Sequence, residues 1–165
     1  PRAMQGMGLL YATSNRGACH LRGAAWTEDF TDVSTIGRAP AVKTAQDGMA
    51  MYDSTGLCMF ARGGIGNDGL LDQLNAGLPG TWDAERLTIT GELIWNLERQ
   101  FNLAAGLTSA DDTLPKRMLE EPAKTGAAAG KVNMLGDMLP DYYELRGWTK
   151  DGVPTPETLS RLSLS

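Results

Sequence analysis

A carboxylate, a glycine and a thiol lie within six residues at Asp53-Ser54-Thr55-Gly56-Leu57-Cys58. A carboxylate such as that of Asp53 can accept two hydrogen bonds from the edge of a planar aminopyrimidine ring. A thiolate such as that of Cys58 can bind a soft metal or an iron–sulfur cluster. Gly56 lets the backbone approach a cofactor because it carries no Cβ atom. The same residues also fit a helix end followed by a core cysteine, so this spacing alone leaves both interpretations open.

A polar stretch at residues 13–22 contains the only histidine of the chain, His20. An imidazole changes its protonation state near neutral pH and can therefore transfer protons. Small residues lie on both sides of this stretch, which is typical of the wall of a cofactor or substrate site. A histidine that caps a helix or fills a polar gap is the alternative interpretation.

Length, charge and cysteine content exclude several classes of protein. The 165 residues are the length of a single domain, and a net charge of −5 without a basic patch argues against a nucleic-acid partner. No apolar run is long enough to cross a membrane. Cys19 and Cys58 do not form a CxxC pair, so we expect no disulfide framework and a reducing, cytoplasmic location. The start at Pro1 rather than Met indicates a piece of a longer chain.

Hydrophobic periodicity predicts helices and no alternating strand pattern, so the predicted fold class is mainly α. The longest helix is expected at residues 82–103, with Thr81 as its N-cap and Gly106 as its stop signal. Leu93, Leu97 and Phe101 form its apolar stripe, and Gly91 lets a neighbour pack closely. The other helices are expected at residues 5–11, 42–54, 68–76, 134–146 and 156–162.

Two adjacent carboxylates, Asp111 and Asp112, allow either a metal site or a helix cap with an ion-paired loop. We favour the cap and the ion pair, and Pro115 nearby indicates the first position of a short helix.

Five motifs, taken together and in this order, resemble the C-terminal part of the aldehyde ferredoxin oxidoreductases, which are tungsten-pterin enzymes. The resemblance covers nearly the whole chain. The motifs are Tyr11-Ala12-Thr13-Ser14-Asn15-Arg16-Gly17-Ala18-Cys19-His20, Asp53-x-x-Gly56-x-Cys58, Asn96-Leu97-Glu98-Arg99-x-Phe101-Asn102, Asp111-Asp112-x-Leu114-Pro115-x-Arg117 and Tyr142-Tyr143-Glu144-Leu145-Arg146-Gly147-Trp148.

The resemblance implies a role for each residue around the second motif. Cys58 is implied as the fourth ligand of a [4Fe-4S] cluster, whose other three thiolates come from elsewhere in the protein. Asp53 is implied to bind a pterin, and Leu57 and Met59 to line the pterin near the cluster.

The first motif and the residue two positions after it supply the remaining implied site residues. His20 is implied to lie beside the tungsten as a proton donor or acceptor. Arg22 occupies a position where the family often carries a lysine that contacts the cofactor. Cys19 is not expected to be a ligand.

The implied protein is an oxidoreductase with a tungsten (or molybdenum) bis-pyranopterin cofactor. Residues 1–165 would be its last helical domain, and an N-terminal β-rich domain and a middle helical domain would complete the cofactor site. The implied reaction oxidises an aldehyde to a carboxylic acid and passes the electrons to ferredoxin. Two alternative functions remain: an enzyme that reduces an aromatic acyl-CoA, or a cofactor-free helical domain that binds other proteins. The oligomeric state stays open, and a homodimer is possible.

Overall fold

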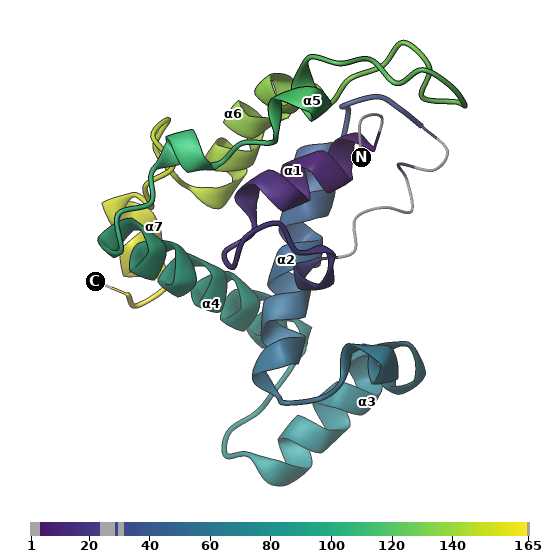
Figure 1. Cartoon of the computed structure of the whole chain (residues 1–165). Coiled ribbons are helices and arrows are strands. Elements are labelled where there is room, and N and C mark those ends of the chain that lie inside the picture. Colours follow the sequence, from purple (N-terminus) through teal and green to yellow (C-terminus); the bar gives the residue numbers. More distant parts are fainter. Residues whose placement is uncertain (1–3, 24–28, 30–31, 165) are drawn as a thin grey trace.

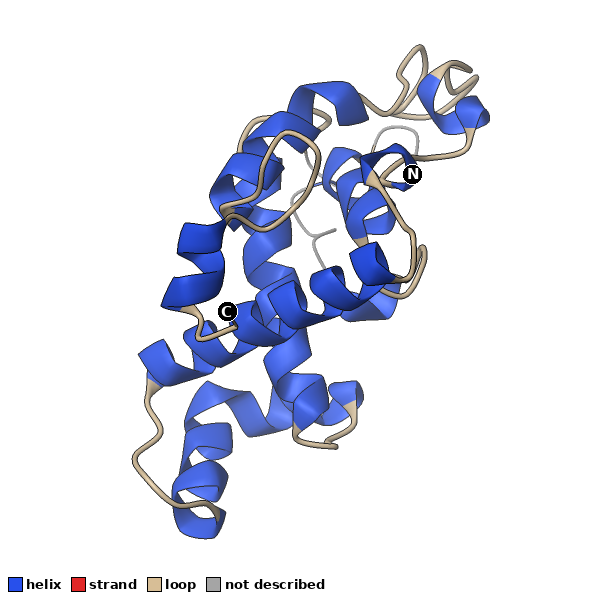
Figure 2. Cartoon of the chain, turned by 90° about the vertical axis from the view of Figure 1, so that its left-hand side faces the viewer, coloured by secondary structure: helices blue, strands red, loops and turns tan. Residues whose placement is uncertain are grey.

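The computed structural model describes residues 4–23, 29 and 32–164, and within these ranges the chain folds into helices joined by loops (Figure 2). The predicted mainly α class is confirmed. The helices are α1 (Gln5–Thr13), α2 (Arg38–Ser54), α3 (Arg62–Gly77), α4 (Ala84–Ala104), α5 (Lys116–Leu119), α6 (Leu135–Arg146) and α7 (Pro156–Arg161). Short 3-10 turns form η1 (His20–Arg22), η3 (Met59–Ala61) and η4 (Ser109–Asp111).

Helix α2 lies at the centre of the fold and contacts α1, α4 and α6 (Figure 1). The main hydrophobic core forms where these four helices meet. Leu9 of α1, Val42 of α2, Trp95 of α4 and Tyr142 of α6 are fully buried there. Burial of each such side chain contributes roughly 1.5–3 kcal/mol.

A buried arginine joins α6 to α2 within this core. Arg146 Nη2 donates to Gln46 Oε1 (2.8 Å), Nε donates to the Tyr142 hydroxyl (2.9 Å), and Nη1 pairs with Asp47. The guanidinium also lies over the Trp95 ring, 5.0 Å from its centroid. Because its charge and hydrogen-bonding groups are matched, this arginine can be fully buried, and it sets the position of α6 against α2.

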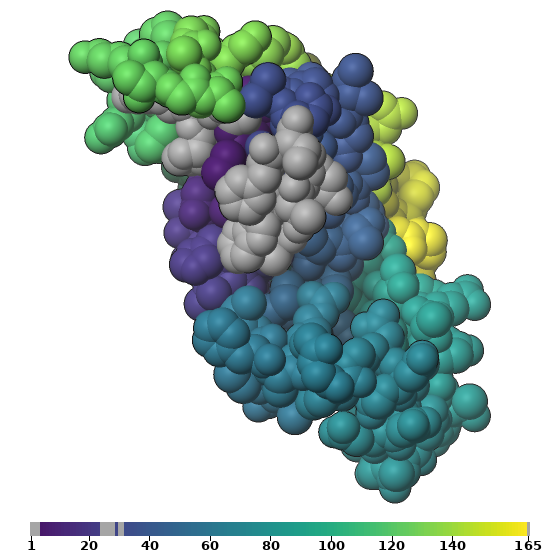
Figure 3. All heavy atoms as spheres, turned by 90° about the vertical axis from the view of Figure 1, so that its right-hand side faces the viewer, coloured from purple at the N-terminus to yellow at the C-terminus, as the bar shows by residue number. Residues whose placement is uncertain are grey.

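Helix α3 forms one end of the molecule (Figures 1 and 3). A second hydrophobic cluster, which includes Met51, Tyr52, Leu70 and Leu87, holds it against α2 and α4. The sequence predicted that this helix would begin only at residue 68. It begins at Arg62 instead and is interrupted at Gly66, whose φ of 65° and ψ of 179° are not helical. The glycine-rich segment therefore kinks the helix rather than preceding it.

The N-terminus of α4 differs from the prediction. The side chain of Asp83 accepts a hydrogen bond from the Arg86 backbone N–H (2.8 Å), so Asp83 is the cap and the helix begins at Ala84. Thr81 as the cap was therefore wrong by two residues. The predicted end is confirmed, since the helix stops at Ala104 and Gly106 has a φ of +99°.

The buried face of α4 also differs from the predicted stripe. Leu97 and Phe101 are 52% and 74% exposed, whereas Trp95, Asn96 and Arg99 are buried. The inward face contains polar residues because distant segments supply their partners. The predicted close packing at Gly91 is confirmed, since a Cβ atom there would lie 2.1 Å from the Asp47 carbonyl oxygen.

The two adjacent carboxylates fulfil the favoured prediction. Asp111 forms a capping box with Thr108 at η4. Asp112 is buried and accepts hydrogen bonds from Arg99 Nη1 (2.8 Å) and Nη2 (2.7 Å). Tyr143 donates a short hydrogen bond to the same carboxylate. Asp112 thus forms a structural ion pair with Arg99.

The described helices include none that is both long enough and apolar enough to cross a membrane.

Candidate cofactor-binding site

Two of the predicted site residues, Arg22 and Asp53, are bonded to each other. Arg22 Nη1 lies 2.8 Å from Asp53 Oδ2, and Arg22 Nη2 lies 2.6 Å from Glu98 Oε1. Arg22 is the last residue of η1, Asp53 lies at the C-terminal end of α2, and Glu98 lies on α4. The guanidinium therefore links three segments that are far apart in the sequence, and it lies 5.9 Å from the centroid of the Trp95 ring.

The Arg22 guanidinium is held in its charged form. Burial alone would lower its pKa, but the charge of Glu98 and the hydrogen bonds to Asp53 and Glu98 outweigh burial and raise the pKa above its ordinary value. The arginine side chain is only 8% exposed, whereas the Asp53 and Glu98 side chains are 29% and 37% exposed. The cluster thus has a buried positive centre and a partly accessible negative edge.

Asp53 keeps capacity for a further partner. Arg22 occupies its Oδ2 atom, and no described residue donates a hydrogen bond to its Oδ1 atom. A carboxylate has about four lone-pair positions. The accessible part of Asp53 can therefore accept hydrogen bonds from a ligand while Arg22 holds the side chain in place.

Glu98 belongs to this cluster, although the sequence analysis did not name it as a site residue. Asn15 Nδ2 also donates to Glu98 Oε2 (3.0 Å), and Asn102 Nδ2 donates to the Asn15 carbonyl (2.7 Å). The signal that could have identified Glu98 is its motif, Asn96-Leu97-Glu98-Arg99, which is one of the five quoted for the resemblance.

Cys58 follows α2 and immediately precedes η3. Its side chain is exposed, and the thiol is free. Gly56, two residues earlier, has a φ of +76°, which favours glycine, and no atom lies within 4 Å of the position of a Cβ there. Leu57 and Met59 are half-buried on either side of Cys58. The structure therefore places the sulfur at the surface rather than in the core.

The described residues contain no group of three or more histidine, cysteine, aspartate or glutamate side chains that could hold a metal. A single accessible thiol such as that of Cys58 can serve as one ligand of a site whose other ligands lie elsewhere.

His20 is the first residue of η1 and is exposed, two positions before Arg22. Neighbouring Cys19 accepts a hydrogen bond from Arg16 Nη2 (3.2 Å). Burial alone would raise the pKa of Cys19, but the hydrogen bond and charge of Arg16, together with backbone hydrogen bonds from Leu21 and Arg22, outweigh it and lower the pKa. The turn thus presents an imidazole at the surface next to the Arg22 cluster.

Several polar atoms near the cluster are buried and have no hydrogen-bond partner among the described residues: Ser14 Oγ, Asn15 Oδ1 and Arg22 Nε. A buried polar atom without a hydrogen bond costs roughly 1–3 kcal/mol, so such atoms indicate a missing partner. Both donors and acceptors occur among them. Together with the accessible edge of Asp53 and the exposed thiol of Cys58, they fit a large polar cofactor beside a metal cluster.

Comparison with known proteins identifies relatives along the whole chain. Residues 1–164 match the family described as "Aldehyde ferredoxin oxidoreductase, domains 2 & 3". The tungsten-containing aldehyde ferredoxin oxidoreductase of Pyrococcus furiosus is 45% identical over 175 residues, an alignment that covers 100% of this chain and 29% of the relative. The enzyme of the same name from Thermococcus kodakarensis is 43% identical, with the same coverage. The chain therefore spans less than a third of the length of these curated relatives.

A solved structure shares the fold. The active-site complex BamBC of benzoyl-coenzyme A reductase, bound to 1,5-dienoyl-CoA, superposes with a TM-score of 0.60 at 23% identity. The superposition covers 79% of this chain and 20% of that one. Because the family match covers residues 1–164, the chain belongs to the aldehyde ferredoxin oxidoreductase family.

Proposed function

We propose that this chain is the C-terminal, cofactor-binding helical domain (residues 1–165) of an enzyme that oxidises aldehydes to carboxylic acids and transfers the electrons to ferredoxin. The observation that carries the proposal is the Arg22–Asp53–Glu98 cluster, which holds a partly accessible carboxylate five residues before an exposed thiol. Membership of a family whose relatives are named tungsten-containing oxidoreductases supports the same conclusion.

Asp53 would bind the aminopyrimidine edge of a tungsten (or molybdenum) bis-pyranopterin through its free Oδ1 atom. Arg22 would hold the carboxylate in its orientation, and its Nε–H, which has no partner among the described residues, is a further donor for the cofactor. Leu57 and Met59 would contact the ring beside the cluster. Cys58 would provide the fourth thiolate of a [4Fe-4S] cluster. The cofactor and the cluster, when bound, supply two-electron chemistry and one-electron transfer respectively.

His20 would move protons during the reaction. Oxidation of an aldehyde consumes one water and releases a carboxylic acid, two protons and two electrons. An exposed imidazole at the start of η1 can accept one of these protons at a ring nitrogen and return it to solvent. The electrons would leave one at a time to ferredoxin.

The remaining walls of the site would come from other parts of the same protein, since the curated relatives are more than three times as long as the aligned region. The residues described in this chain include one candidate cluster ligand, Cys58, and a complete cubane cluster normally needs four. The active species would therefore be the full-length, cytoplasmic protein rather than this chain alone.

Metal analysis and turnover of the full-length protein, purified without oxygen, test the proposal. We expect tungsten or molybdenum with about four irons per chain, and ferredoxin reduction that depends on an added aldehyde. Absence of these metals would instead support a cofactor-free interaction domain. Metals together with reduction of an aromatic acyl-CoA, but no aldehyde oxidation, would reject the proposed substrate class.

A further inference from the structure

A cavity with both polar and apolar lining residues lies between α2, the start of α3 and the first turn of α4. It has a volume of about 230 Å³ and shares no residue with the Arg22 cluster. Lys43, Tyr52, Arg62 and Asn67 contribute polar groups to its lining. The volume is below the usual lower limit of about 300 Å³ for sites that hold drug-sized ligands. The cavity is therefore suited to a ligand of only a few heavy atoms.

Arg62 brings an unpaired positive charge to this cavity. Among the described residues no carboxylate forms an ion pair with it, and its guanidinium Nη1 donates only to the thioether sulfur of Met49 (2.9 Å). A thioether is a weak acceptor and carries no charge. Gly48 makes room for the guanidinium, because a Cβ atom there would lie 3.0 Å from Arg62 Nη2. The site thus contains a cation without its counterion.

Tyr52 supplies a second group that lacks a partner. Its side chain lines the cavity and is 2% exposed, and its buried hydroxyl has no hydrogen-bond partner in the part of the chain that the structure describes. The Tyr52 ring centroid lies 5.9 Å from Arg62 Cζ, so the two groups belong to one site. A buried hydroxyl without a partner is costly unless a ligand or water satisfies it.

The acidic residue in the lining does not neutralise Arg62. Asp47 already binds two cations: Lys43 Nζ lies 2.9 Å from its Oδ2, and Arg146 pairs with its Oδ1. Lys43 also lies 3.5 Å from Glu92 Oε1. Since the lining carboxylate is compensated by other cations, Arg62 is left with an attraction for an anion from outside the described chain.

We propose that this cavity binds a small organic carboxylate. A guanidinium matches the two oxygens of a carboxylate in a planar, bidentate arrangement, and the Tyr52 hydroxyl can donate a further hydrogen bond. Met51, Leu70 and Leu87 give the rest of the lining an apolar character, which favours a carboxylate with a short hydrocarbon chain over inorganic phosphate. The inference rests on this geometry and not on the reaction proposed above.

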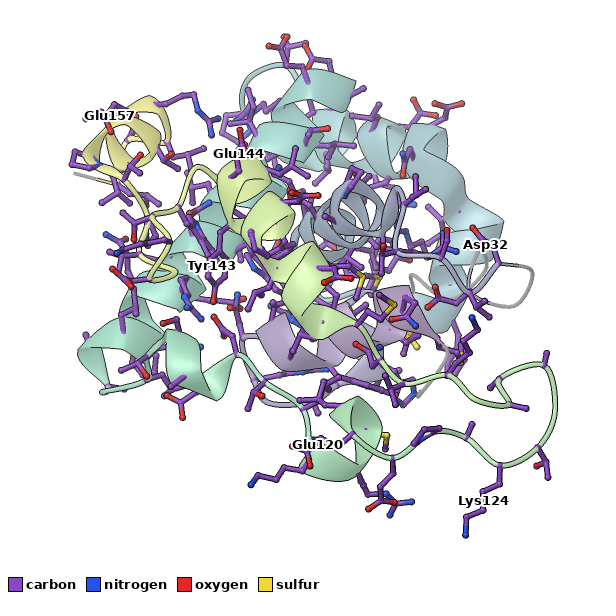
Figure 4. All side chains as sticks on the ribbon, turned by 90° about the horizontal axis from the view of Figure 1, so that it is seen from above. Asp32, Glu120, Lys124, Tyr143, Glu144 and Glu157 are labelled. Carbon is purple, nitrogen blue, oxygen red and sulfur yellow. The ribbon has the colours of Figure 1, made fainter. Side chains whose placement is uncertain are left out.

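Titration calorimetry of the full-length protein with propionate, and separately with inorganic phosphate, tests the proposal. We expect saturable propionate binding, weakened about tenfold to a hundredfold by Arg62→Gln, because a charge-assisted pair is lost. Tyr52→Phe should weaken it about fivefold for the loss of one neutral hydrogen bond. Lys124→Gln, which removes a cation from the long loop between α5 and α6 (Figure 4), is the charge-matched control and should bind like the wild type.

Tyr52→Phe is a variant in which weaker binding can be separated from a loss of folding. It deletes a hydroxyl that has no partner in the described structure, so the melting temperature without propionate should not fall. Asp53→Asn separates the cavity from the proposed cofactor site, since that variant should keep propionate binding even without cofactor. No propionate binding to the wild type, equal binding by Arg62→Gln, or binding of phosphate in preference to propionate would each overturn the proposal.

Discussion

Arg22 Nη1 donates to Asp53 Oδ2 across 2.8 Å, although the two residues are 31 positions apart in the sequence. The contact ties the turn that carries His20 to the helix end that precedes Cys58. Two segments that the sequence marked separately as candidates for cofactor chemistry are thus joined by a partly buried ion pair, and the relative placement of their functional groups depends on it.

Asp53→Asn should therefore weaken both the turn and the cofactor site. The substitution keeps the side-chain size but removes one charged partner of a buried arginine, which costs about 1.5–3 kcal/mol. We expect a lower melting temperature and a tungsten content well below that of the wild-type full-length protein. Asp72→Asn on the exposed side of α3 is the matched control. Wild-type tungsten content in the Asp53 variant would contradict a cofactor role for this carboxylate.

Cys58→Ala should abolish cluster binding in the full-length protein, because a [4Fe-4S] cluster with three thiolates lacks one ligand. Iron per chain and the visible absorption of the cluster should both drop. Cys19→Ala provides the comparison, since Cys19 interacts with Arg16 and is not assigned to the cluster. Equal iron in the Cys58 variant and the wild type would remove Cys58 from the ligand set.

His20→Asn should reduce turnover while leaving the metals in place. Asparagine retains hydrogen-bonding groups of similar size but cannot carry a proton at neutral pH. General acid–base groups typically contribute about 10²- to 10⁴-fold to rate, so we expect a loss of that order in kcat. Tungsten and iron contents near the wild-type values are the control for folding, and full activity would exclude His20 from proton transfer.

Gly91→Ala should destabilise the protein by about 1–3 kcal/mol, the range for overpacking. The added methyl would lie 2.1 Å from the Asp47 carbonyl oxygen of α2, so the two helices would have to separate. Gly136→Ala in α6 makes the same chemical change where no atom lies within 4 Å. That control should leave stability unchanged or raise it by up to about 1 kcal/mol, as alanine is the better helix former. Equal melting temperatures for the two variants would argue against the tight α2–α4 contact.

Glu92→Gln should change how stability depends on pH. Glu92 accepts hydrogen bonds from Arg161 Nη1 (3.0 Å) and Nη2 (2.9 Å). Burial alone would raise the pKa of Glu92, but these hydrogen bonds and the charges of Arg161 and Lys43 outweigh it and lower the pKa below its ordinary value of 4.5. Since the folded pKa is the lower one, the stabilisation is complete above about pH 4.5 and is lost as the pH falls through the folded pKa.

Thermal unfolding between pH 7 and pH 3 measures this effect. The Glu92→Gln variant should melt below the wild type at pH 7, and the difference should shrink toward acid. Glu157→Gln removes an exposed carboxylate from α7 (Figure 4) and should follow the wild-type curve. If the melting temperatures of Glu92→Gln and the wild type differed by the same amount from pH 7 to pH 3, the ion pairs of Glu92 would not cause the loss of stability in acid.

The motif on α4 connects the other motifs of the chain. Asn96 Oδ1 accepts a hydrogen bond from Trp148 Nε1 (2.7 Å), and Arg99 pairs with Asp112 (2.7 Å). Glu98 accepts from Asn15 (3.0 Å) and from Arg22, which in turn reaches Asp53. Segments separated by 13 to 83 positions thus meet along this part of α4, and each of these polar side chains has a partner there.

These polar contacts explain the main error of the sequence-based interpretation. Leu93, Leu97 and Phe101 have the spacing of a buried stripe, yet Leu97 and Phe101 are exposed and Arg99 is buried. Local periodicity assumes that polar residues face water. It cannot include ion pairs with residues such as Asp112, whose position depends on the whole fold.

The sequence by itself determined the helical class, most helix positions and the order of the motifs, because these depend on neighbouring residues, caps and glycine stops. Gly106 and Gly147 end α4 and α6 as their local backbone requires. Only the tertiary structure decided which side of α4 is buried, that Glu98 joins Arg22 and Asp53, and that Arg62 faces a cavity without a counterion. Those features depend on charges brought together from distant segments, and the energy of a charge depends on what surrounds it after folding.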